Sequence, residues 1–183
     1  PVLTNQDQKH LFFFRWGLIP FWADDKKIGY KMINARVETV AKKPAYRAAF
    51  KRRRCLVPFD GFYEWKKEKD GKQPYRVVRK DGEVFCIAGL WEKWESKGKD
   101  ETIHSFTLIT QEAAGKQKEV HDRMPALLLP EHERTWLDDE VPAEGLLDLI
   151  APYPDDELDI YKVSKAVNNV RNNSEELIHP IDD

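Results

Sequence analysis

Residues 55–65 read Cys-Leu-Val-Pro-Phe-Asp-Gly-Phe-Tyr-Glu-Trp, and this stretch decides the fold. An apolar run ends at Pro58, the chain turns through Asp60-Gly61, and a second extended run follows. The same kind of signal returns at Asp70-Gly71 and Asp81-Gly82, where Asp-Gly pairs predict hairpins. The sequence therefore predicts a single α+β domain of mostly antiparallel sheet, with short helices outside it.

Glu64 is the chemically notable residue of this stretch. Strand alternation sends Glu64 and Phe62 to one face and Trp65 to the other. A carboxylate beside an aromatic ring loses hydration, so its pKa should rise toward neutrality and make it a candidate general acid or base. A solvated glutamate of an edge strand, paired with one of the lysines that follow it, fits the same pattern.

The remaining elements follow from apolar periodicity and from the positions of Gly and Pro. We find no internal repeat and no linker, which favours one domain over residues 1–183. Further strands are predicted over 11–19, 75–79, 84–90, 106–109, 126–129 and 158–163, and helices over 44–51, 113–120, 131–137, 145–150 and 164–170.

Composition narrows the class of protein. No apolar run is long enough to span a membrane, and no secretory signal pattern is present. The two cysteines, Cys55 and Cys86, both lie in apolar runs, which excludes a disulfide framework and favours a reducing cytoplasm. No spacing resembles a zinc site.

Charge is divided unevenly along the chain. Residues 1–80 hold 20 Lys and Arg against 8 Asp and Glu, whereas residues 81–183 hold 10 against 24. The basic part is also rich in aromatic residues. Cations that follow phosphates and rings that stack on bases suit single-stranded nucleic acid. Mutual neutralisation of the two parts within one fold would give the same split.

Two further polar groups are candidates for a site. Asn34, Arg36 and Glu38 alternate, so in an extended chain they face the same way. His121 is followed by Asp122-Arg123, and either neighbour is placed to fix the tautomer of the ring. A solvated edge strand and a polar connection would account for these residues equally well.

Six motifs occur in an order that resembles the SRAP (SOS response-associated peptidase) family, the YedK/HMCES-like abasic-site processing proteins. The resemblance extends from about residue 11 to 180. The motifs are Trp16-Gly17-Leu18-Ile19-Pro20, Ile33-Asn34-Ala35-Arg36-Val37-Glu38-Thr39, Phe62-Tyr63-Glu64-Trp65, Ile87-Ala88-Gly89-Leu90-Trp91, Phe106-Thr107-Leu108-Ile109-Thr110 and His121-Asp122-Arg123-Met124-Pro125.

This resemblance implies a fold and a chemistry. The SRAP fold has a barrel-like core of mostly antiparallel strands. Its members bind single-stranded DNA, or single-strand/double-strand junctions, at abasic sites. An N-terminal cysteine forms a Schiff base with the opened sugar and then closes a thiazolidine, which crosslinks protein to DNA. No metal or organic cofactor is required. A monomer in the cytoplasm, associated with the nucleoid when bound to DNA, is expected.

The resemblance also implies roles for individual residues. Asn34 would hold the cysteine and sugar, Glu64 would move protons in ring opening and Schiff-base formation, and His121 would act as an acid near the sugar oxygen. Arg36 would contact a DNA phosphate. Three further residues would contact DNA, two as an aromatic wedge and one in the groove: Trp22, Phe21 and Thr110.

One departure from the family pattern is plain. The family begins with Cys-Gly-Arg-Phe, whereas this sequence begins at Pro1 and has 15 residues before Trp16. We therefore expect the catalytic cysteine to be missing from the chain as given, with Cys55 and Cys86 poor replacements. Two alternatives to the crosslinking enzyme stay open: a cysteine-type peptidase that processes itself, and a non-catalytic module that binds single-stranded DNA.

Overall fold

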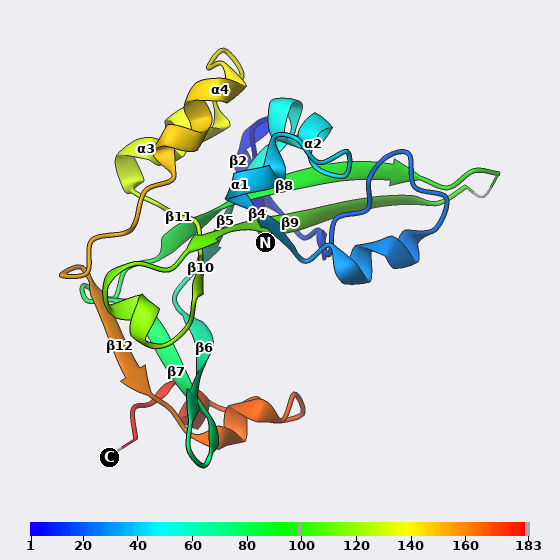
Figure 1. The fold of residues 1–183 in the computed structure, drawn as a ribbon. Helices are drawn as coiled ribbons and strands as arrows, with labels where there is room; N and C mark the ends of the chain where they lie inside the picture. Colours follow the sequence, from blue (N-terminus) through cyan, green and yellow to red (C-terminus); the bar gives the residue numbers. More distant parts are fainter. Residues whose placement is uncertain (99, 182–183) are drawn as a thin grey trace. The chain divides into compact units, whose positions relative to one another are not determined.

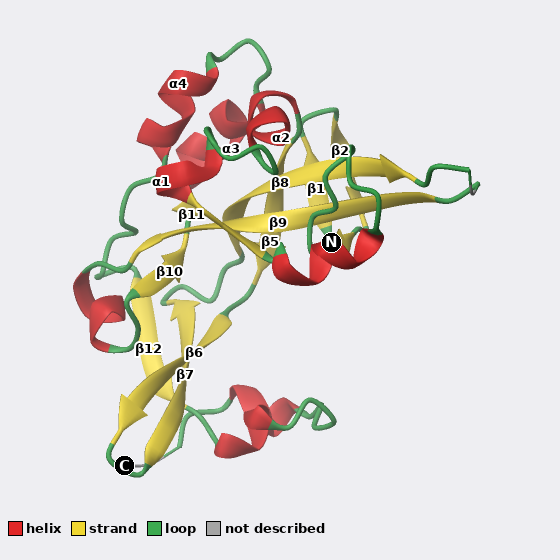
Figure 2. Ribbon diagram, turned by 45° about the vertical axis from the view of Figure 1, so that its right-hand side comes forward, coloured by secondary structure: helices red, strands yellow, loops and turns green. Residues whose placement is uncertain are grey.

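The computed structural model describes residues 1–98 and 100–181, and its elements fall into two units built from interleaved segments (Figure 1). Unit 1 comprises Pro1–Pro58, Cys86–Gln111 and Pro125–Ala151, and unit 2 comprises Phe59–Phe85, Glu112–Met124 and Pro152–Asp183. The domain predicted over 1–183 includes residues 99, 182 and 183, which lie outside the described residues. Most strand pairs are antiparallel and the helices are short, so the predicted α+β class is confirmed (Figure 2).

Two long antiparallel strands form the centre of unit 1, β8 (Phe85–Glu95) and β9 (Thr102–Glu112). Strand β8 is apolar along most of its length, and Leu90 and Trp91 are both buried. Gly89 is required within it, because a Cβ there would lie 2.8 Å from the Sγ of Cys55. This close approach is the physical reason for a glycine inside a buried strand.

Three strands continue the sheet beyond β8, in the order β8-β5-β1-β2. They are β5 (Arg54–Phe59), β1 (Val2–Thr4) and β2 (Asp7–Phe12). A further short strand, β11 (Leu127–Leu128), pairs antiparallel with β8. The apolar run predicted around Cys55 is thus a strand in the interior of the sheet.

Two short strands pair with β9 in parallel, β3 (Arg15–Trp16) and β4 (Asn34–Arg36). Between them the N–H of Ile19 donates to the Oγ of Ser105 at 2.8 Å. The single strand predicted over 11–19 is wrong. Gly17 has a φ of 109°, a conformation that no regular strand contains, so extended pairing stops at Trp16.

Short helices complete the core of unit 1. Phe50, Trp136 and Leu146 come from three different helices and are buried in one cluster with Leu90 and Ile109. Full burial of side chains of this size contributes about 1.5–3 kcal/mol each. The helices of unit 1 are α1 (Val37–Val40), α2 (Arg47–Arg52), α3 (Pro130–Leu137), α4 (Ala143–Leu146) and the 3-10 helices η1 (Lys26–Lys31) and η3 (Leu147–Leu149).

The start of α2 differs from the prediction. Pro44 was expected to occupy the first turn, but the helix begins at Arg47. Residues 41–46 form turns instead, in which the N–H of Tyr46 donates to the carbonyl of Lys43 at 3.0 Å. The proline therefore lies just before the helix and not inside it.

Unit 2 is built on a three-stranded antiparallel sheet in the order β12-β7-β6. Strands β6 (Phe62–Glu68) and β7 (Gly71–Arg79) form a hairpin through Asp70-Gly71, as predicted. Strand β12 (Leu158–Lys162) pairs along the other edge of β7. Strand β6 is therefore an edge strand.

The turn at Asp81-Gly82 is present, but the hairpin predicted there is wrong. Gly82 has a φ of 76° and the Asp81 carboxylate accepts the N–H of Glu83 at 3.0 Å. Both edges of β7 are already occupied by β6 and β12, so β7 does not pair with β8. A turn signal identifies a change of direction and not the partner of the next strand.

The remaining elements of unit 2 are short 3-10 helices and one short strand. The longer helices predicted over 113–120 and 164–170 are therefore wrong in length. Gly115 has a φ of 52°, outside the range of a right-handed helix, so η2 cannot extend toward Ala113. The elements are η2 (Gly115–Glu119), η4 (Lys165–Asn168) and η5 (Glu175–Ile178). The short strand β10 (Arg123–Pro125) follows η2 in the sequence.

Candidate functional site

Glu64 lies in the middle of β6, directly opposite Tyr75 of β7. The strand pleat places its side chain on the same face as Phe62. The side chain is 25% exposed. Loss of hydration raises the pKa of its carboxyl, against smaller lowering contributions from the charge of His121 and the backbone N–H of Trp65. The expected rise in pKa is confirmed, with the expected physical cause.

The alternative in which Glu64 pairs with a lysine is wrong for the described residues. Lys67 forms no ion pair with any of them, and the ammonium group of Lys66 lies 6.0 Å from the centre of the Tyr75 ring. Alternation along β6 places Lys67 on the face opposite Glu64.

The ring of His121 is held by the main chain of Arg123. The N–H of Arg123 donates to Nδ1 at 3.0 Å, which leaves the proton of the neutral ring on Nε2. The carbonyl of Arg123 lies 3.2 Å from the same nitrogen and can accept from Nδ1 when the ring is protonated. Of the two neighbours expected to fix the tautomer, Asp122 and Arg123, it is Arg123 that does so.

Glu64 and His121 face one another within unit 2. The Oε2 of Glu64 lies 4.0 Å from the Nδ1 of His121. This distance exceeds that of a hydrogen bond, so the two groups do not share a proton. A carboxyl with raised pKa beside an imidazole is an arrangement suited to general acid–base catalysis.

A second group of predicted residues gathers in unit 1, along β4. Asn34 and Arg36 are exposed and flank the buried Ala35, so both project from the same face. The register with β9 places Arg36 beside Thr110. Arg36 forms no ion pair within the described residues, which leaves its guanidinium free for an external anion.

Glu38 does not belong to this group, and its predicted alternation with Asn34 and Arg36 is wrong. The strand ends at Arg36, which is the N-cap of α1, and Val37 already has helical geometry. A residue in the first turn of a helix no longer follows the two-residue period of the strand.

The aromatic pair between β3 and η1 is exposed. Phe21 is 56% exposed and Trp22 is 45% exposed, against 5% for the neighbouring Ala23. Ala23 therefore anchors this loop and leaves two rings available for stacking. Their predicted contact with DNA stays a prediction.

The two cysteines are held in unreactive forms. Cys55 in β5 is fully buried, and burial strongly raises the pKa of its thiol. Burial first, and then the charge of Glu133, raises the pKa of Cys86 to about 12. The chain is therefore not without thiols, and the expectation of a missing nucleophile is not supported. Burial raises the pKa of both thiols, which keeps the thiolate fraction of each low at neutral pH.

The described residues contain no group of three or more His, Cys, Asp or Glu arranged to hold a metal ion. Across the same residues, no helix combines the length and apolar character needed to cross a membrane.

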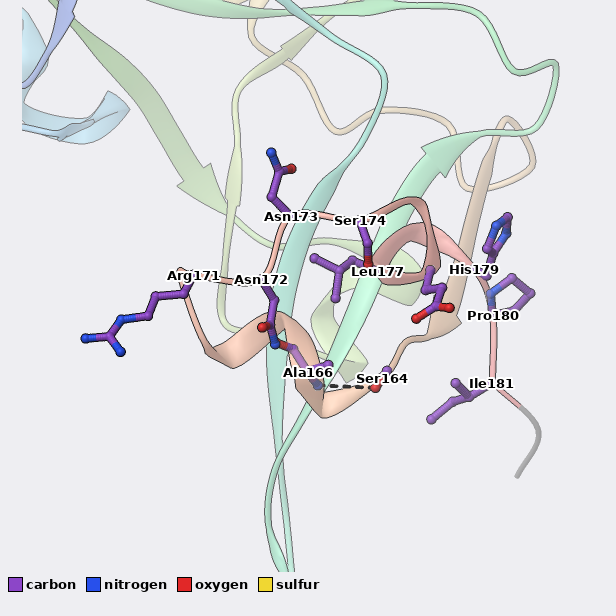
Figure 3. Close-up of a pocket in the computed structure, with 11 residues that line it drawn as sticks. Ser164, Ala166, Arg171, Asn172, Asn173, Ser174, Leu177, His179, Pro180 and Ile181 are labelled. Carbon is purple, nitrogen blue, oxygen red and sulfur yellow. Dashed lines mark hydrogen bonds between the residues drawn. The ribbon is translucent and has the colours of Figure 1, made fainter.

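A cavity of about 640 Å³ lies in the C-terminal part of unit 2 and contains none of the predicted site residues (Figure 3). Two local bonds shape its floor. The Oγ of Ser164 accepts the N–H of Ala166 at 3.2 Å, and the amide of Asn172 donates to the carbonyl of Ala166 at 2.8 Å. The Arg171 side chain extends away from this turn. The cavity is thus framed largely by its own loop.

Comparison with known proteins identifies the family. The family model described as SOS response associated peptidase (SRAP) matches residues 1–170. The chain belongs to the SRAP family. The abasic site processing protein YoaM of Bacillus subtilis is 43% identical over 179 residues, covering 97% of this chain and 78% of the relative. The abasic site processing protein YoqW of the same organism is 41% identical over 97% and 80% of the two chains.

A solved structure shows the same SRAP fold. A protein from Bacteroides thetaiotaomicron superposes with a TM-score of 0.84 at 29% identity, over 92% of this chain and 76% of that one. The family resemblance inferred from six ordered motifs is therefore confirmed.

A buried ion pair of this SRAP chain was not predicted from the sequence. Arg53 Nη2 lies 2.8 Å from the Oε2 of Glu92, whose side chain is only 3% exposed. Glu92 stands in the apolar run of β8 directly after Trp91, and a carboxylate in a buried strand requires a partner. The position of Glu92 within an apolar run was therefore the sequence signal that this carboxylate has a buried partner.

Proposed function

We propose that this protein processes abasic sites in DNA, in the DNA damage response, by forming a covalent crosslink to the lesion. The observation that carries the proposal is the pair Glu64 and His121, 4.0 Å apart with the pKa of the carboxyl raised, in a member of the SRAP family. The relatives named as abasic site processing proteins give the substrate class.

Proton transfer is the chemistry that this pair is suited to supply. An abasic sugar is mostly a closed hemiacetal, so ring opening requires a base for the C1′ hydroxyl and an acid for the ring oxygen. Glu64 takes the hydroxyl proton, and the Nε2–H of His121 donates to the ring oxygen. The N–H of Arg123, which donates to Nδ1, favours the tautomer with that proton on Nε2.

Crosslinking then follows in two steps. The α-amine of an N-terminal cysteine adds to C1′, and the resulting carbinolamine loses water to form an imine, with the proton for the departing hydroxyl coming from Glu64. The thiol then adds to the imine carbon while its proton passes to the nitrogen, which closes a thiazolidine. One water leaves overall. Because their thiol pKa values are raised, Cys55 and Cys86 are not assigned this role.

Binding of the strand is assigned to residues of unit 1. Arg36 contacts a phosphate, and the neighbouring Asn34 and Thr110 supply hydrogen bonds to sugar and backbone. Exposed rings at Phe21 and Trp22 stack on bases next to the lesion. A single strand, alone or at a junction, is the partner that such a combination of guanidinium, amide and rings suits.

The test is the intact mass of the full-length protein after incubation with an abasic oligonucleotide. The expected species has the mass of protein plus oligonucleotide minus one water, and an unmodified oligonucleotide gives none. Absence of this species with active, folded protein would contradict the proposal.

A second candidate function is binding of single strands without chemistry, which is supported by the exposed rings and by the free guanidinium of Arg36. Engagement of about four phosphates predicts a slope near −3 of log affinity against log salt. In that case an unmodified strand binds as tightly as an abasic one, and no adduct forms.

A further inference from the structure

A basic groove in unit 1 lies along α2, and apart from Phe21 none of its residues has been assigned a role above. Its volume is about 490 Å³, and its lining consists of Phe21, Arg47, Ala48, Lys51, Arg52 and Arg53. We call this set the α2 groove. Four of the six residues are cations, and no carboxylate among the described residues lines it.

The cations on α2 are concentrated on one side of the helix. Lys51 follows Arg47 by four positions, where like charges repel one another. Arg47 also stands in the first turn, at the end of the helix that disfavours a cation. Arg47, Lys51 and Arg52 are all exposed, and none of them forms an ion pair within the described part of the chain. A bound anion would relieve this repulsion.

An alternative explanation is that the cations of α2 form a solvated cap at the end of the helix. This explanation accounts for only some of these charges. Lys51 and Arg52 lie in the last turn, where cations are favoured by the helix dipole. The helix dipole does not explain the cation at Arg47, and it does not explain the exposed aromatic ring in the groove.

The wall of the groove is built on a buried carboxylate. Glu92 binds the Nη2 of Arg53 at 2.8 Å and accepts the N–H of Lys93 at 3.0 Å. The backbone N–H of Phe21 is near enough to lower the pKa of this carboxyl slightly. One buried group therefore holds Arg53 beside the loop that carries the aromatic ring.

Arg53 retains an unused donor. Its Nε is buried and has no hydrogen-bond partner, although Nη2 is paired with Glu92. A buried donor without an acceptor is unfavourable.

We propose that the α2 groove binds phosphodiester groups of a single DNA strand, with one base stacked on the ring of Phe21. Alternating phosphates and bases match a groove that offers cations and an aromatic ring side by side. The inference rests on the proposed function, because it assigns the groove to the DNA strand on which that function acts. Phe21 thus stacks on a base next to the lesion, as in the proposed function, and the α2 groove holds the phosphates beside that base.

The test measures binding of an unmodified fluorescein-labelled oligothymidylate by anisotropy across a salt series. The double variant Lys51→Gln/Arg52→Gln should bind about tenfold more weakly, with the log–log salt slope reduced by about 1.4. The charge-preserving variant Arg52→Lys should keep the slope. The matched control Lys9→Gln/Lys80→Gln removes two exposed cations outside the groove and should change neither quantity.

The stacking contact is tested separately. Phe21→Ala should weaken binding about tenfold without changing the salt slope, and Phe21→Trp should restore it. Circular dichroism of each variant establishes that it is folded. Equal affinities and slopes for the wild type and the groove variants would overturn the assignment, as would failure of the wild type to bind the unmodified strand.

The two proposals fail in different ways. If the wild type forms no adduct with an abasic strand but the groove variants still lose affinity for the unmodified one, crosslinking is wrong and the groove stands. If the adduct forms and the groove variants bind like the wild type, only the groove assignment is wrong.

Discussion

The carboxylate Oε2 of Glu64 lies 4.0 Å from the Nδ1 of His121, and the same nitrogen accepts the backbone N–H of Arg123. The imidazole thus has one nitrogen occupied by the protein and the other free. Glu64 lies close to the ring without forming a hydrogen bond to it.

Replacement of the carboxyl should separate chemistry from binding. In the full-length protein, Glu64→Gln should slow crosslink formation by about a hundredfold, because a positioned acid–base group contributes about that much or more. Affinity for abasic DNA should stay within about twofold. Glu68→Gln, an exposed change on the same strand, is the control. A parallel loss of binding and chemistry would make Glu64 a structural residue.

Glu64 should also give the stability a specific pH dependence. Burial raises its pKa above the ordinary 4.5, so the folded state holds this proton more tightly than the unfolded state does. The stabilisation is fully present below the unfolded pKa and is lost as pH rises through the folded pKa. Glu64→Gln should therefore have the higher melting temperature at pH 7, with the difference vanishing near pH 4. A difference that grows toward acid pH would contradict this reasoning.

Arg54 should be indispensable for stability, although it stands in a run of three arginines that resembles a solvated helix cap. Its side chain is 1% exposed. It donates to four backbone carbonyls, those of Phe50, Lys51, Trp136 and Asp138, at 2.7–3.2 Å. Lysine cannot reproduce this fork, so Arg54→Lys should cost about 3 kcal/mol and lower Tm by roughly 6–12 °C. Arg52→Lys, two residues earlier and exposed, should change Tm by less than about 2 °C.

The two thiols should resist alkylation in the folded protein. At pH 7.5, iodoacetamide should modify Cys86 on the order of a thousandfold more slowly than in the unfolded chain, because its pKa of about 12 leaves little thiolate. Cys55, fully buried, should react more slowly still. Peptide mapping after timed quenching measures both rates.

The same residues decide which sulfur performs the proposed crosslinking. Cys55→Ala in the full-length protein should leave adduct formation intact. Complete loss of the adduct in a folded Cys55→Ala protein would identify Cys55 as the nucleophile and overturn the assignment to an N-terminal cysteine.

Local signals predicted the parts of the fold that depend on neighbours in sequence. The Asp70-Gly71 turn, the face of Glu64 and the rise of its pKa all follow from a two-residue period and from one apolar neighbour. The absence of a hairpin between β7 and β8 at Asp81-Gly82 could not be predicted from local signals. It depends on β12 occupying the free edge of β7, and β12 begins only at Leu158.

For the candidate site too, features that depend on sequence neighbours were predicted, whereas contacts between distant segments were not. Alternation placed Asn34 and Arg36 correctly on one face, but the helix that starts at Val37 removed Glu38 from it. The pairing of Arg36 with Thr110 depends on a parallel register across the sheet, which no local pattern encodes. Arg53 and Glu92 were missed because each looks ordinary in its own segment and only the fold joins them.

The parallel strands β3 and β4 also constrain how the protein is made. The N–H of Ile19 donates to the Oγ of Ser105, 86 positions later, and among the described residues the strands on either side of Ile19 pair only with β9. At about 5–20 residues per second of translation, the first segment waits roughly 4–17 s for its partner to emerge from the ribosome. During that interval Leu18 and Ile19, both fully buried in the folded protein, stay exposed to water, so the nascent chain should be an early client of chaperones that bind apolar segments.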